Sequence, residues 1–328
     1  MSEFFSAYGL FLLEFVTLIG VVLIVVVVVM TSTRRAGHTE GLTVKHLNKQ
    51  FEDTANVLKR VLMSKERFKK ETKARHKEQK KERRAKKKEL DERARLFVLD
   101  FKGDMRASAT ASLREEISAL LAVATDRDEV LLRLENPGGM VHEHGLAASQ
   151  LLRIKQRGIP LLIAVDKVAA SGGYLMACVA DRLMSAPFAI IGSIGVLAQL
   201  PNFHRLLEDK GVDFEQITAG RYKRTLTVFG ENTEEGRQKL KDELEDVHEL
   251  FKAQIAEHRP QVQLQSVATG EHWYGVRALE LKLVDEIRTS DDFLIAAAKD
   301  KDLYQLSYKR RRPLSERVMG GAEALLSR

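Results

Sequence analysis

Three short apolar runs in the middle of this 328-residue sequence are separated by two helical patterns. The runs, at residues 96–99, 130–134 and 161–165, are typical of buried strands, and the helical patterns cover residues 112–124 and 141–156. Strand, helix, strand, helix, strand in this order implies parallel pairing with crossover helices. We therefore expect an α/β fold built on a parallel sheet.

Two further segments extend this interpretation. Residues 233–259 are predicted to form one long charged helix, with Pro260 near its end. Residues 183–200 are apolar enough to resemble a membrane span. Pro187 and the glycines within that segment instead favour buried turns and short strands of the α/β core.

An apolar run of 21 residues, 10–30, lies near the N-terminus. At a helical rise near 1.5 Å per residue it spans roughly 31 Å, which matches the hydrocarbon core of a bilayer. A cleaved signal peptide is the alternative, but no basic residue precedes the run and residues 31–34 make a poor cleavage site. We therefore expect residues 1–33 to form an uncleaved anchor whose partner is membrane lipid.

The positive charge of the chain is confined to one segment. Between residues 34 and 95 there are 22 Lys or Arg against 10 Asp or Glu, an excess of 12, so the formal charge of +7 leaves about −5 elsewhere. This distribution argues against nucleic acid as a partner. We interpret residues 34–94 as a helical or disordered basic spacer, which either lifts the α/β domain from the membrane or holds anionic headgroups. The α/β domain then covers residues 95–308, and residues 309–328 form a basic tail.

The chain has a single cysteine, Cys178, so an intramolecular disulfide is excluded. The residues around it are apolar. We predict a small buried hydrophobic side chain rather than a catalytic or metal-binding thiol.

The run Ala169-Ala170-Ser171-Gly172-Gly173 follows a predicted strand and precedes a helical pattern. A serine at such a junction lies beside free backbone N–H groups that favour developing negative charge. The paired glycines allow a tight turn and close approach of a substrate. From these residues alone, Ser171 is equally well explained as a nucleophile or as a plain helix N-cap.

A second glycine-rich turn, Pro137-Gly138-Gly139, ends another predicted strand. Consecutive amides in such a turn are the kind of donor that stabilises the tetrahedral oxyanion of acyl transfer. No histidine near Ser171 has a diagnostic context, so a Ser–Lys pair is the alternative to a Ser–His pair. Lys223 and Lys167 are both candidates for the base, and their spacing does not choose between them.

Four motifs in order resemble the signal peptide peptidase A family of serine peptidases, and most of all its SohB-type members. They are Pro-Gly-Gly at 137–139, Ala-Ser-Gly-Gly-Tyr at 170–174, Gly-Ser-Ile-Gly at 192–195 and Tyr-Lys at 222–223. The resemblance covers the whole α/β region and extends to the anchor and spacer. It implies a crotonase/Clp-like fold of repeated ββα units.

The resemblance also implies roles for individual residues. Ser171 would be the nucleophile, Lys223 the general base, and Ser193 the residue that orients the lysine. No metal and no cofactor are implied. The expected substrates are small or unfolded peptides, such as signal-peptide remnants.

The same resemblance assigns the oxyanion hole to Gly138 or Gly139 together with the amide of Gly172. It further implies homo-oligomers in which the serine and the lysine come from neighbouring protomers. His272, Trp273 and Tyr274 are also typical of the family, and we expect them to pack rather than to catalyse.

The side of the membrane is left open. Arg34, Arg35 and Lys45 follow the anchor and favour a cytoplasmic domain by the positive-inside rule, whereas the family is expected on the periplasmic side of the inner membrane. Two rival functions are a membrane-tethered scaffold that uses residues 34–93 as a coiled coil, and an acyl-CoA enzyme of the crotonase type.

Overall fold

The computed structural model describes residues 15–20, 41–85 and 93–310. The chain divides into two compact units, residues 1–41 with 309–328, and residues 42–308. Residues 15–20 of the first unit are helical. The rest of the predicted anchor, and nearly all of the predicted basic tail, lie outside the described residues. Within the described ranges, no helix is both long and apolar enough to cross a bilayer.

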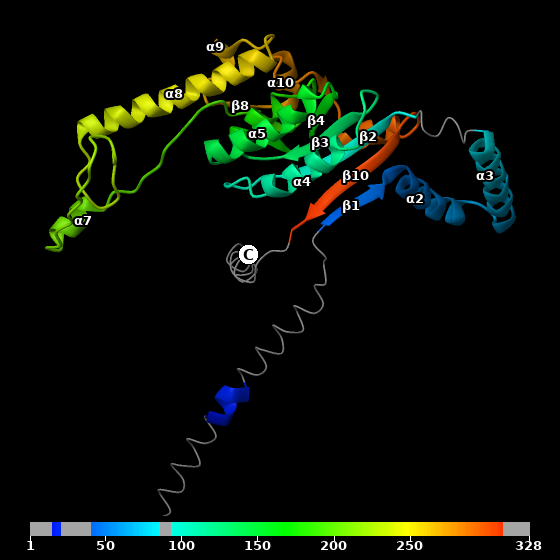
Figure 1. Ribbon diagram of the computed structural model, residues 1–328, viewed down its shortest axis with the longest axis horizontal. Coiled ribbons are helices and arrows are strands. Elements are labelled where there is room, and N and C mark those ends of the chain that lie inside the picture. The colour runs from blue at the N-terminus through cyan, green and yellow to red at the C-terminus, as the bar shows by residue number, and fades with distance from the viewer. Residues whose placement is uncertain (1–14, 21–40, 86–92, 311–328) are drawn as a thin grey trace, which may run out of the picture. The chain divides into compact units, whose positions relative to one another are not determined.

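A seven-stranded sheet organises the larger unit, with the strand order β1-β10-β2-β3-β4-β6-β9 (Figure 1). From β10 to β9, every neighbouring pair is parallel. The predicted α/β fold with a parallel sheet is therefore confirmed, and the three predicted strands correspond to β2, β3 and β4. The strands are β1 (Gly41–His46), β2 (Arg95–Lys102), β3 (Glu129–Glu135), β4 (Leu161–Val165), β6 (Arg182–Ser185), β9 (Glu286–Ile287) and β10 (Asp302–Lys309).

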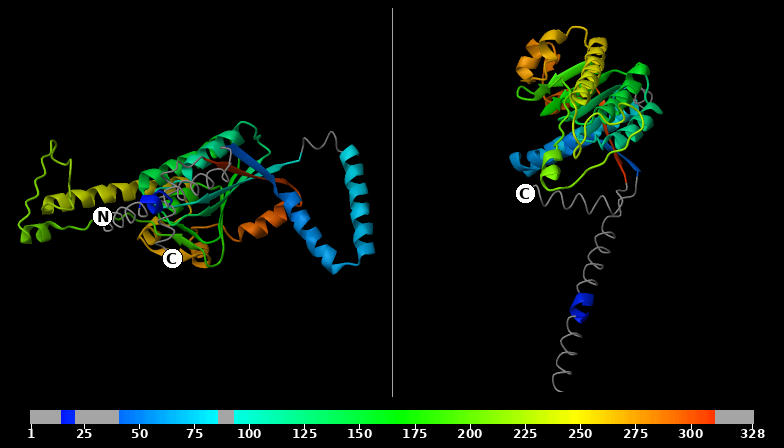
Figure 2. Two further views of the ribbon diagram at one scale, coloured as in Figure 1. Left: turned by 90° about the horizontal axis from the view of Figure 1, so that it is seen from below. Right: turned by 90° about the vertical axis from the view of Figure 1, so that its left-hand side faces the viewer.

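Both faces of the sheet are covered, because successive side chains of a strand point to opposite faces. On β2, Phe97, Leu99 and Phe101 belong to a large core, whereas Leu96 and Val98 belong to a smaller one. The large core is covered by α4 (Thr110–Leu121), α5 (Val141–Gln156) and α6 (Gly172–Ala177), and the smaller core by α11 (Ser290–Ala297) and the start of α2 (Leu47–Leu62) (Figure 2).

A second, three-stranded sheet lies beyond the carboxyl end of β4. It consists of β5 (Val168–Ala170), β7 (Ile190–Gly192) and β8 (His272–Tyr274) in the order β5-β7-β8. A bridge between Asn136 and Ala169 joins the end of β3 to β5. The segment 183–200 supplies β6 and β7, as predicted; the two strands are mostly buried, whereas Pro187 and Phe188 in the turn between them and Leu197 onward are exposed. The small sheet thus brings the carboxyl ends of β3 and β4 close to β5 and β7.

The predicted charged helix is present as α8 (Glu234–His258), and the Thr233 hydroxyl caps it by accepting the N–H of Gly236 at 3.1 Å. We call residues 196–233, between β7 and α8, the arm. The arm contains α7 (His204–Asp209) and lies beside the N-terminal end of α8, away from the sheet (Figure 1). Two short helices, α9 (Leu264–Val267) and α10 (Gly275–Glu280), follow α8.

A buried ion pair fixes the other end of α8. The Arg259 side chain is only 2% exposed and donates to both carboxylate oxygens of Asp285, at 2.6 and 3.1 Å. Asp285 also accepts the N–H of Leu183 at 2.7 Å, which ties the pair to β6. The end of α8 is therefore attached directly to the core sheet.

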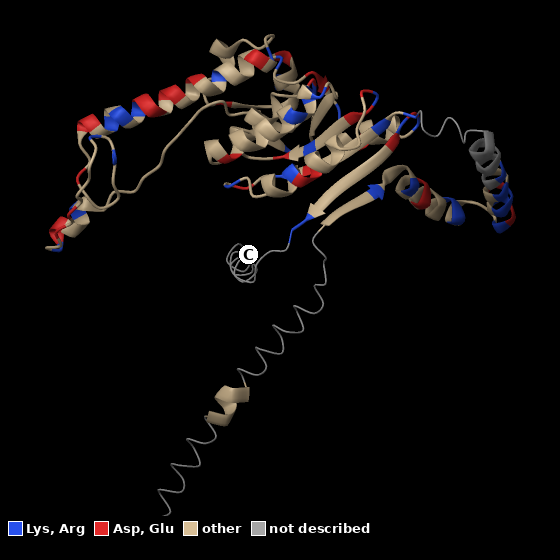
Figure 3. Ribbon diagram, viewed as in Figure 1, with Lys and Arg blue, Asp and Glu red and all other residues tan. Residues whose placement is uncertain are grey.

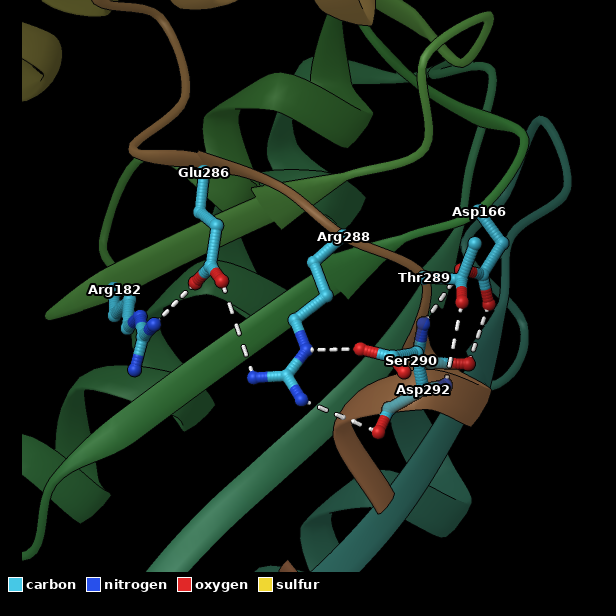
Figure 4. Close-up of polar contacts among 7 residues, drawn as sticks. All are labelled: Asp166, Arg182, Glu286, Arg288, Thr289, Ser290 and Asp292. Carbon is cyan, nitrogen blue, oxygen red and sulfur yellow. Dashed lines mark hydrogen bonds and ion pairs between the residues drawn. The ribbon is translucent and has the colours of Figure 1, made fainter. Parts of the chain in front are cut away.

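A network of polar contacts links the segment from β9 to α11 with β6 and with the end of β4 (Figure 4). Asp166, directly after β4, accepts both the N–H of Ser290 at 2.8 Å and its hydroxyl at 2.5 Å. Arg288 donates to Asp292 at 2.6 Å and lies 3.9 Å from Glu286. The start of α11 is thereby fixed at the carboxyl end of β4.

The segment predicted as a spacer contains β1, α2 and α3 (Lys65–Ala85). Helices α2 and α3 agree with the helical, rather than the disordered, interpretation of this segment. The strand β1 was not expected. It is an edge strand of the main sheet, next to β10, which is far away in the sequence. Long-range strand pairing of this kind leaves no local pattern in a polar sequence.

Candidate active site

Ser171 lies between β5 and α6, where the chain leaves the small sheet. Its φ of 52° and ψ of −122° are unusual for a residue other than glycine, and such backbone strain concentrates at functional sites. Its N–H donates to the carbonyl of Gly192 at 2.8 Å, and its carbonyl accepts the N–H of Tyr174 at 2.8 Å. The hydroxyl makes no capping bond to α6, so the plain N-cap interpretation is wrong.

The Pro-Gly-Gly turn after β3 packs directly on this serine. A Cβ at Gly138 would lie 2.8 Å from the Cβ of Ser171 and 2.9 Å from the amide nitrogen of Gly172. Gly138 also has a φ of 95°, which glycine adopts without strain. A Cβ at Gly139 would lie 2.3 Å from the carbonyl oxygen of Met105. The structure therefore brings Gly138 and Gly172 beside Ser171, with Gly139 next in the chain.

The amides of the three glycines are not equivalent. The N–H of Gly138 donates to Oδ1 of Asn136 at 2.9 Å, so it is used inside the turn. Among the described residues, the N–H groups of Gly139 and Gly172 have no acceptor. Unpaired amides beside a serine are the donors that an oxyanion requires. Of the two alternatives for the first donor, the geometry favours Gly139 over Gly138.

A buried Asn–His pair supports the turn, and the sequence analysis did not identify it. Asn136 and His144 are both fully buried. Oδ1 of Asn136 lies 3.2 Å from Nε2 of His144, whose Nδ1 lies 2.9 Å from the carbonyl of Met140. A Cβ at Gly172 would meet the His144 ring at 2.5 Å. The pair thus contacts both glycine turns, and the only signal in the sequence was an asparagine directly before Pro-Gly-Gly.

Ser193 leaves the small sheet at the same edge as Ser171. β5 and β7 are parallel with Ala170 opposite Gly192, so the next residue of each strand is one of the two serines. Ser193 also has a positive φ, 51°, and its N–H donates to the carbonyl of Glu271 at 2.6 Å. In the part of the chain that the structure describes, neither hydroxyl has a hydrogen-bond partner.

The two candidate bases are placed differently. Lys167 is exposed, and its Nζ pairs with Glu135 at 3.1 Å, so it does not face Ser171 as an unpaired base. Lys223 is exposed on the arm, where its backbone N–H donates to the carbonyl of Gly220. The arm lies beside α8, away from the sheet (Figure 1). Within one chain the structure does not bring Lys223 to Ser171.

Trp273 has the packing role expected of its segment. β8 is antiparallel to β7, and a Cβ at Gly192 would lie 2.9 Å from the Trp273 ring. Tyr274 packs edge-on against Phe188. Trp273 therefore holds the strand that precedes Ser193.

Cys178 is fully buried, and burial raises the pKa of its thiol to about 12. A thiol with so high a pKa is not a nucleophile at neutral pH. The prediction of a small buried hydrophobic side chain is confirmed.

A cavity of about 290 Å³ lies at the carboxyl ends of β2, β3 and β4 rather than at Ser171. Most of its charged lining residues are paired, for example Arg133 with Asp100 at 2.5 Å and Lys167 with Glu135 at 3.1 Å, and Asp166 accepts hydrogen bonds from Ser290. Because these charges already compensate each other, we assign no ligand to this cavity.

Comparisons with known proteins agree with the motifs. Residues 3–151 match the N-terminal part of peptidase family S49, and residues 153–304 match peptidase family S49 itself. "Probable protease SohB" of Haemophilus influenzae is 47% identical over 332 residues, which cover 98% of this chain and 94% of that protein. A protein of the same name from Buchnera aphidicola subsp. Acyrthosiphon pisum is 57% identical over 233 residues, or 71% of this chain and 69% of that protein. The chain belongs to peptidase family S49.

Proposed function

We propose that the chain is a serine peptidase that uses Ser171 as its nucleophile and Lys223 of a neighbouring copy as its general base. The observation that carries the proposal is the strained backbone of Ser171, held against Gly138 and beside the unpaired amide of Gly172. Strain of order 1–3 kcal/mol is retained where the surrounding structure imposes it, and it is concentrated at reactive positions. Family membership independently supports peptidase chemistry.

The proposed reaction is acyl transfer in two steps. Oγ of Ser171 attacks the scissile carbonyl carbon and gives its proton to the neutral Nζ of Lys223, while the amides of Gly139 and Gly172 bind the oxyanion. Collapse of the intermediate breaks the C–N bond, and Nζ passes the proton to the leaving amine. Water then attacks the acyl-enzyme by the same route, which releases the carboxylic acid and restores the hydroxyl.

The oligomeric part of the proposal rests on the arm. Lys223 is held away from Ser171 of its own chain, so the base must come from elsewhere. The arm also exposes large apolar side chains, for example Ile217 at 94% and Leu197 at 75%. Exposed apolar surface of this kind is typical of contacts between subunits. A neighbouring copy that covers the arm would receive Lys223 of that arm in its own active site. Ser193 of the neighbouring copy would orient the lysine.

The remaining features follow from the same proposal. The order β4, β5, α6 is one ββα unit, which supports a crotonase/Clp-like fold. Residues 10–30 anchor the chain in the inner membrane, and the substrates are small or unfolded peptides. The side of the membrane is assigned by a reporter fused after Arg328 that is active on one side only.

Two inactive variants test the shared site. We expect Ser171→Ala and Lys223→Ala each to abolish peptide cleavage, whereas co-assembled mixtures of the two regain part of the activity. The mixture contains sites that combine an intact Ser171 from one chain with an intact Lys223 from the other. Lys210→Ala, which removes another exposed lysine of the arm, is the matched control and leaves activity unchanged.

A serine-directed phosphonate tests the nucleophile separately. Labelling at Ser171 that is lost in Lys223→Ala supports the proposal. An oligomer that neither cleaves peptides nor reacts with the phosphonate refutes it. If Ser171→Ala retains activity on CoA esters, the acyl-CoA alternative holds instead.

A further inference from the structure

Helix α2 carries one continuous apolar stripe, of which the protein covers only the first part. Leu47 is buried, and Phe51 packs partly buried on the smaller core. At 3.6 residues per turn, Leu58, Val61 and Leu62 fall on the same side of the helix as Leu47. These three side chains are nevertheless 61%, 81% and 80% exposed. The stripe therefore continues uncovered beyond the edge of the core.

The first turn of α2 is fixed, so the stripe is presented in a defined direction. Nδ2 of Asn48 donates to the carbonyls of Ala298 at 3.1 Å and Lys301 at 2.9 Å, and its Oδ1 accepts the N–H of Leu303 at 2.8 Å. Three hydrogen bonds to backbone groups of a distant segment attach the helix to the sheet. The exposed part of the stripe is an extension of a docked helix.

The start of the neighbouring helix α3 contacts the last turn of α2 through the polar side of α2. Lys59 pairs with Glu71 at 2.6 Å, and the Arg60 guanidinium lies 5.5 Å from the centre of the Phe68 ring. At 3.6 residues per turn, Lys59 and Arg60 lie on the polar side of α2, away from Leu58. Contact with α3 therefore leaves the apolar stripe open. We call α2 and α3 together the hairpin.

The hairpin is strongly basic. Its second helix contains 11 Lys or Arg against four Asp or Glu in 21 residues, and α2 adds three against two. Figure 3 shows blue Lys and Arg side by side along the coloured part of α3. Lys65, Arg67, Lys69 and Lys70 at its start are all exposed. The apolar stripe thus borders a surface of positive charge.

This combination selects among possible partners. A second copy of the hairpin would bring like charges together. A nucleic acid would use the charge but leave the stripe uncovered. A bilayer surface with anionic headgroups satisfies both features, because the apolar face of an amphipathic helix enters the headgroup and acyl-chain boundary while basic side chains contact the phosphates.

We propose that the hairpin is a lipid-binding element, in which the stripe of α2 inserts into the surface of an anionic membrane. The proposal concerns residues 47–85 and is independent of the peptidase activity. It is also separate from the anchor proposed for residues 10–30. The inserted helix would fix the orientation of the domain on the membrane, which a single anchor and linker would not.

Environment-sensitive labels test this proposal on the full-length protein. Cys178 is buried, so a nitrobenzoxadiazole maleimide reacts at one introduced cysteine. The test position is Val61→Cys on the stripe, and the matched control is Asp53→Cys, an exposed position on the polar side. Each labelled protein is reconstituted into phosphatidylcholine vesicles with or without phosphatidylglycerol, which also carry a doxyl-lipid quencher.

We expect a blue-shifted and quenched label at position 61 in vesicles with phosphatidylglycerol, and a much smaller effect with phosphatidylcholine alone. The label at position 53 stays in water in both kinds of vesicle. Salt at ~1 M, where the Debye length is about 3 Å, weakens the effect. Lys69→Glu combined with Lys70→Glu also weakens it, while phosphonate labelling of Ser171 is unchanged.

Two results overturn the proposal. One is a label at position 61 that stays unquenched, or is quenched no more than the label at position 53, in anionic vesicles. The other is a blue shift that grows with protein concentration and is insensitive to the doxyl lipid, which would show that a second copy covers the stripe. Failure of Ser171 to react with the phosphonate affects only the proposed peptidase function.

Discussion

Gly138 and Ser171 are in direct contact across the end of the parallel sheet, because a Cβ at Gly138 would lie 2.8 Å from the Cβ of Ser171. The two residues are 33 positions apart in the sequence. Their contact places the turn after β3 against the strained junction between β5 and α6.

Gly138→Ala is expected to lower kcat for peptide cleavage by about 10²–10³-fold. The added methyl group would also lie 2.7 Å from the carbonyl oxygen of Ala170, and φ is 95°, so the turn must move away from Ser171. Loss of an aligned oxyanion donor raises a barrier by about 2.7–4 kcal/mol, which is about 10²–10³-fold in kcat. Gly145→Ala in α5, where a Cβ meets nothing within 4 Å, is the matched control. Unchanged peptide cleavage by Gly138→Ala would contradict the oxyanion assignment.

Asn136→Leu is expected to lower kcat with little change in KM. The substitution leaves the N–H of Gly138 without its acceptor, and an unsatisfied buried donor costs about 1–3 kcal/mol. Because this donor lies inside the turn that carries Gly139, we expect the loss to misalign the proposed oxyanion site rather than the substrate. Asn136→Asp keeps the accepting oxygen and should restore most of the rate of phosphonate labelling. If Asn136 served only the stability of the fold, Asn136→Leu would lower stability, and Asn136→Asp would not restore the rate of phosphonate labelling.

Asp285→Ala is expected to destabilise the protein by about 3–5 kcal/mol, because it leaves the Arg259 charge buried and unpaired. Urea unfolding measures the change. The control is Glu280→Ala, which removes the partner of Arg277 in an exposed ion pair and should change stability little. Equal effects of the two substitutions would show that the Arg259 pair is not the attachment of α8.

Glu116→Gln is expected to stabilise the protein at high pH only. Burial raises the pKa of Glu116 from 4.5 to about 7, although the N–H of Tyr308 donates to its Oε1 at 2.7 Å. Between these values the folded chain keeps a proton that the unfolded chain releases, so stability falls as pH rises from about 4.5 to about 7. The loss, up to about 3 kcal/mol, is absent in the glutamine variant, which still accepts from Tyr308.

The melting temperatures of the parent and of Glu116→Gln, measured from pH 4 to pH 9, check this prediction. The two proteins should melt alike at the acidic end, diverge between about pH 4.5 and about pH 7, and keep a constant difference above that. A constant difference at all pH values would mean that Glu116 does not titrate in this range.

Several elements could be predicted because their signals are local. The three apolar runs became β2, β3 and β4, and the pattern over residues 141–156 became α5. The edge strand β1 could not be predicted, because its polar sequence is a strand only through its place beside β10. Asn136 and His144 were missed for a related reason. Their importance depends on what they contact, and a lone histidine in a helix has no distinguishing pattern.

The sequence by itself determined the α/β architecture, the family and the motifs of the candidate site, because hydrophobic periodicity and short motifs are written in consecutive residues. Only the tertiary structure excluded a side-chain cap at Ser171, since a capping bond depends on where the hydroxyl lies relative to the amides of α6. The fold likewise separated Lys223 from Ser171 and left the stripe of α2 uncovered. Such relationships depend on which distant segments pack together, and sequence spacing does not carry that information.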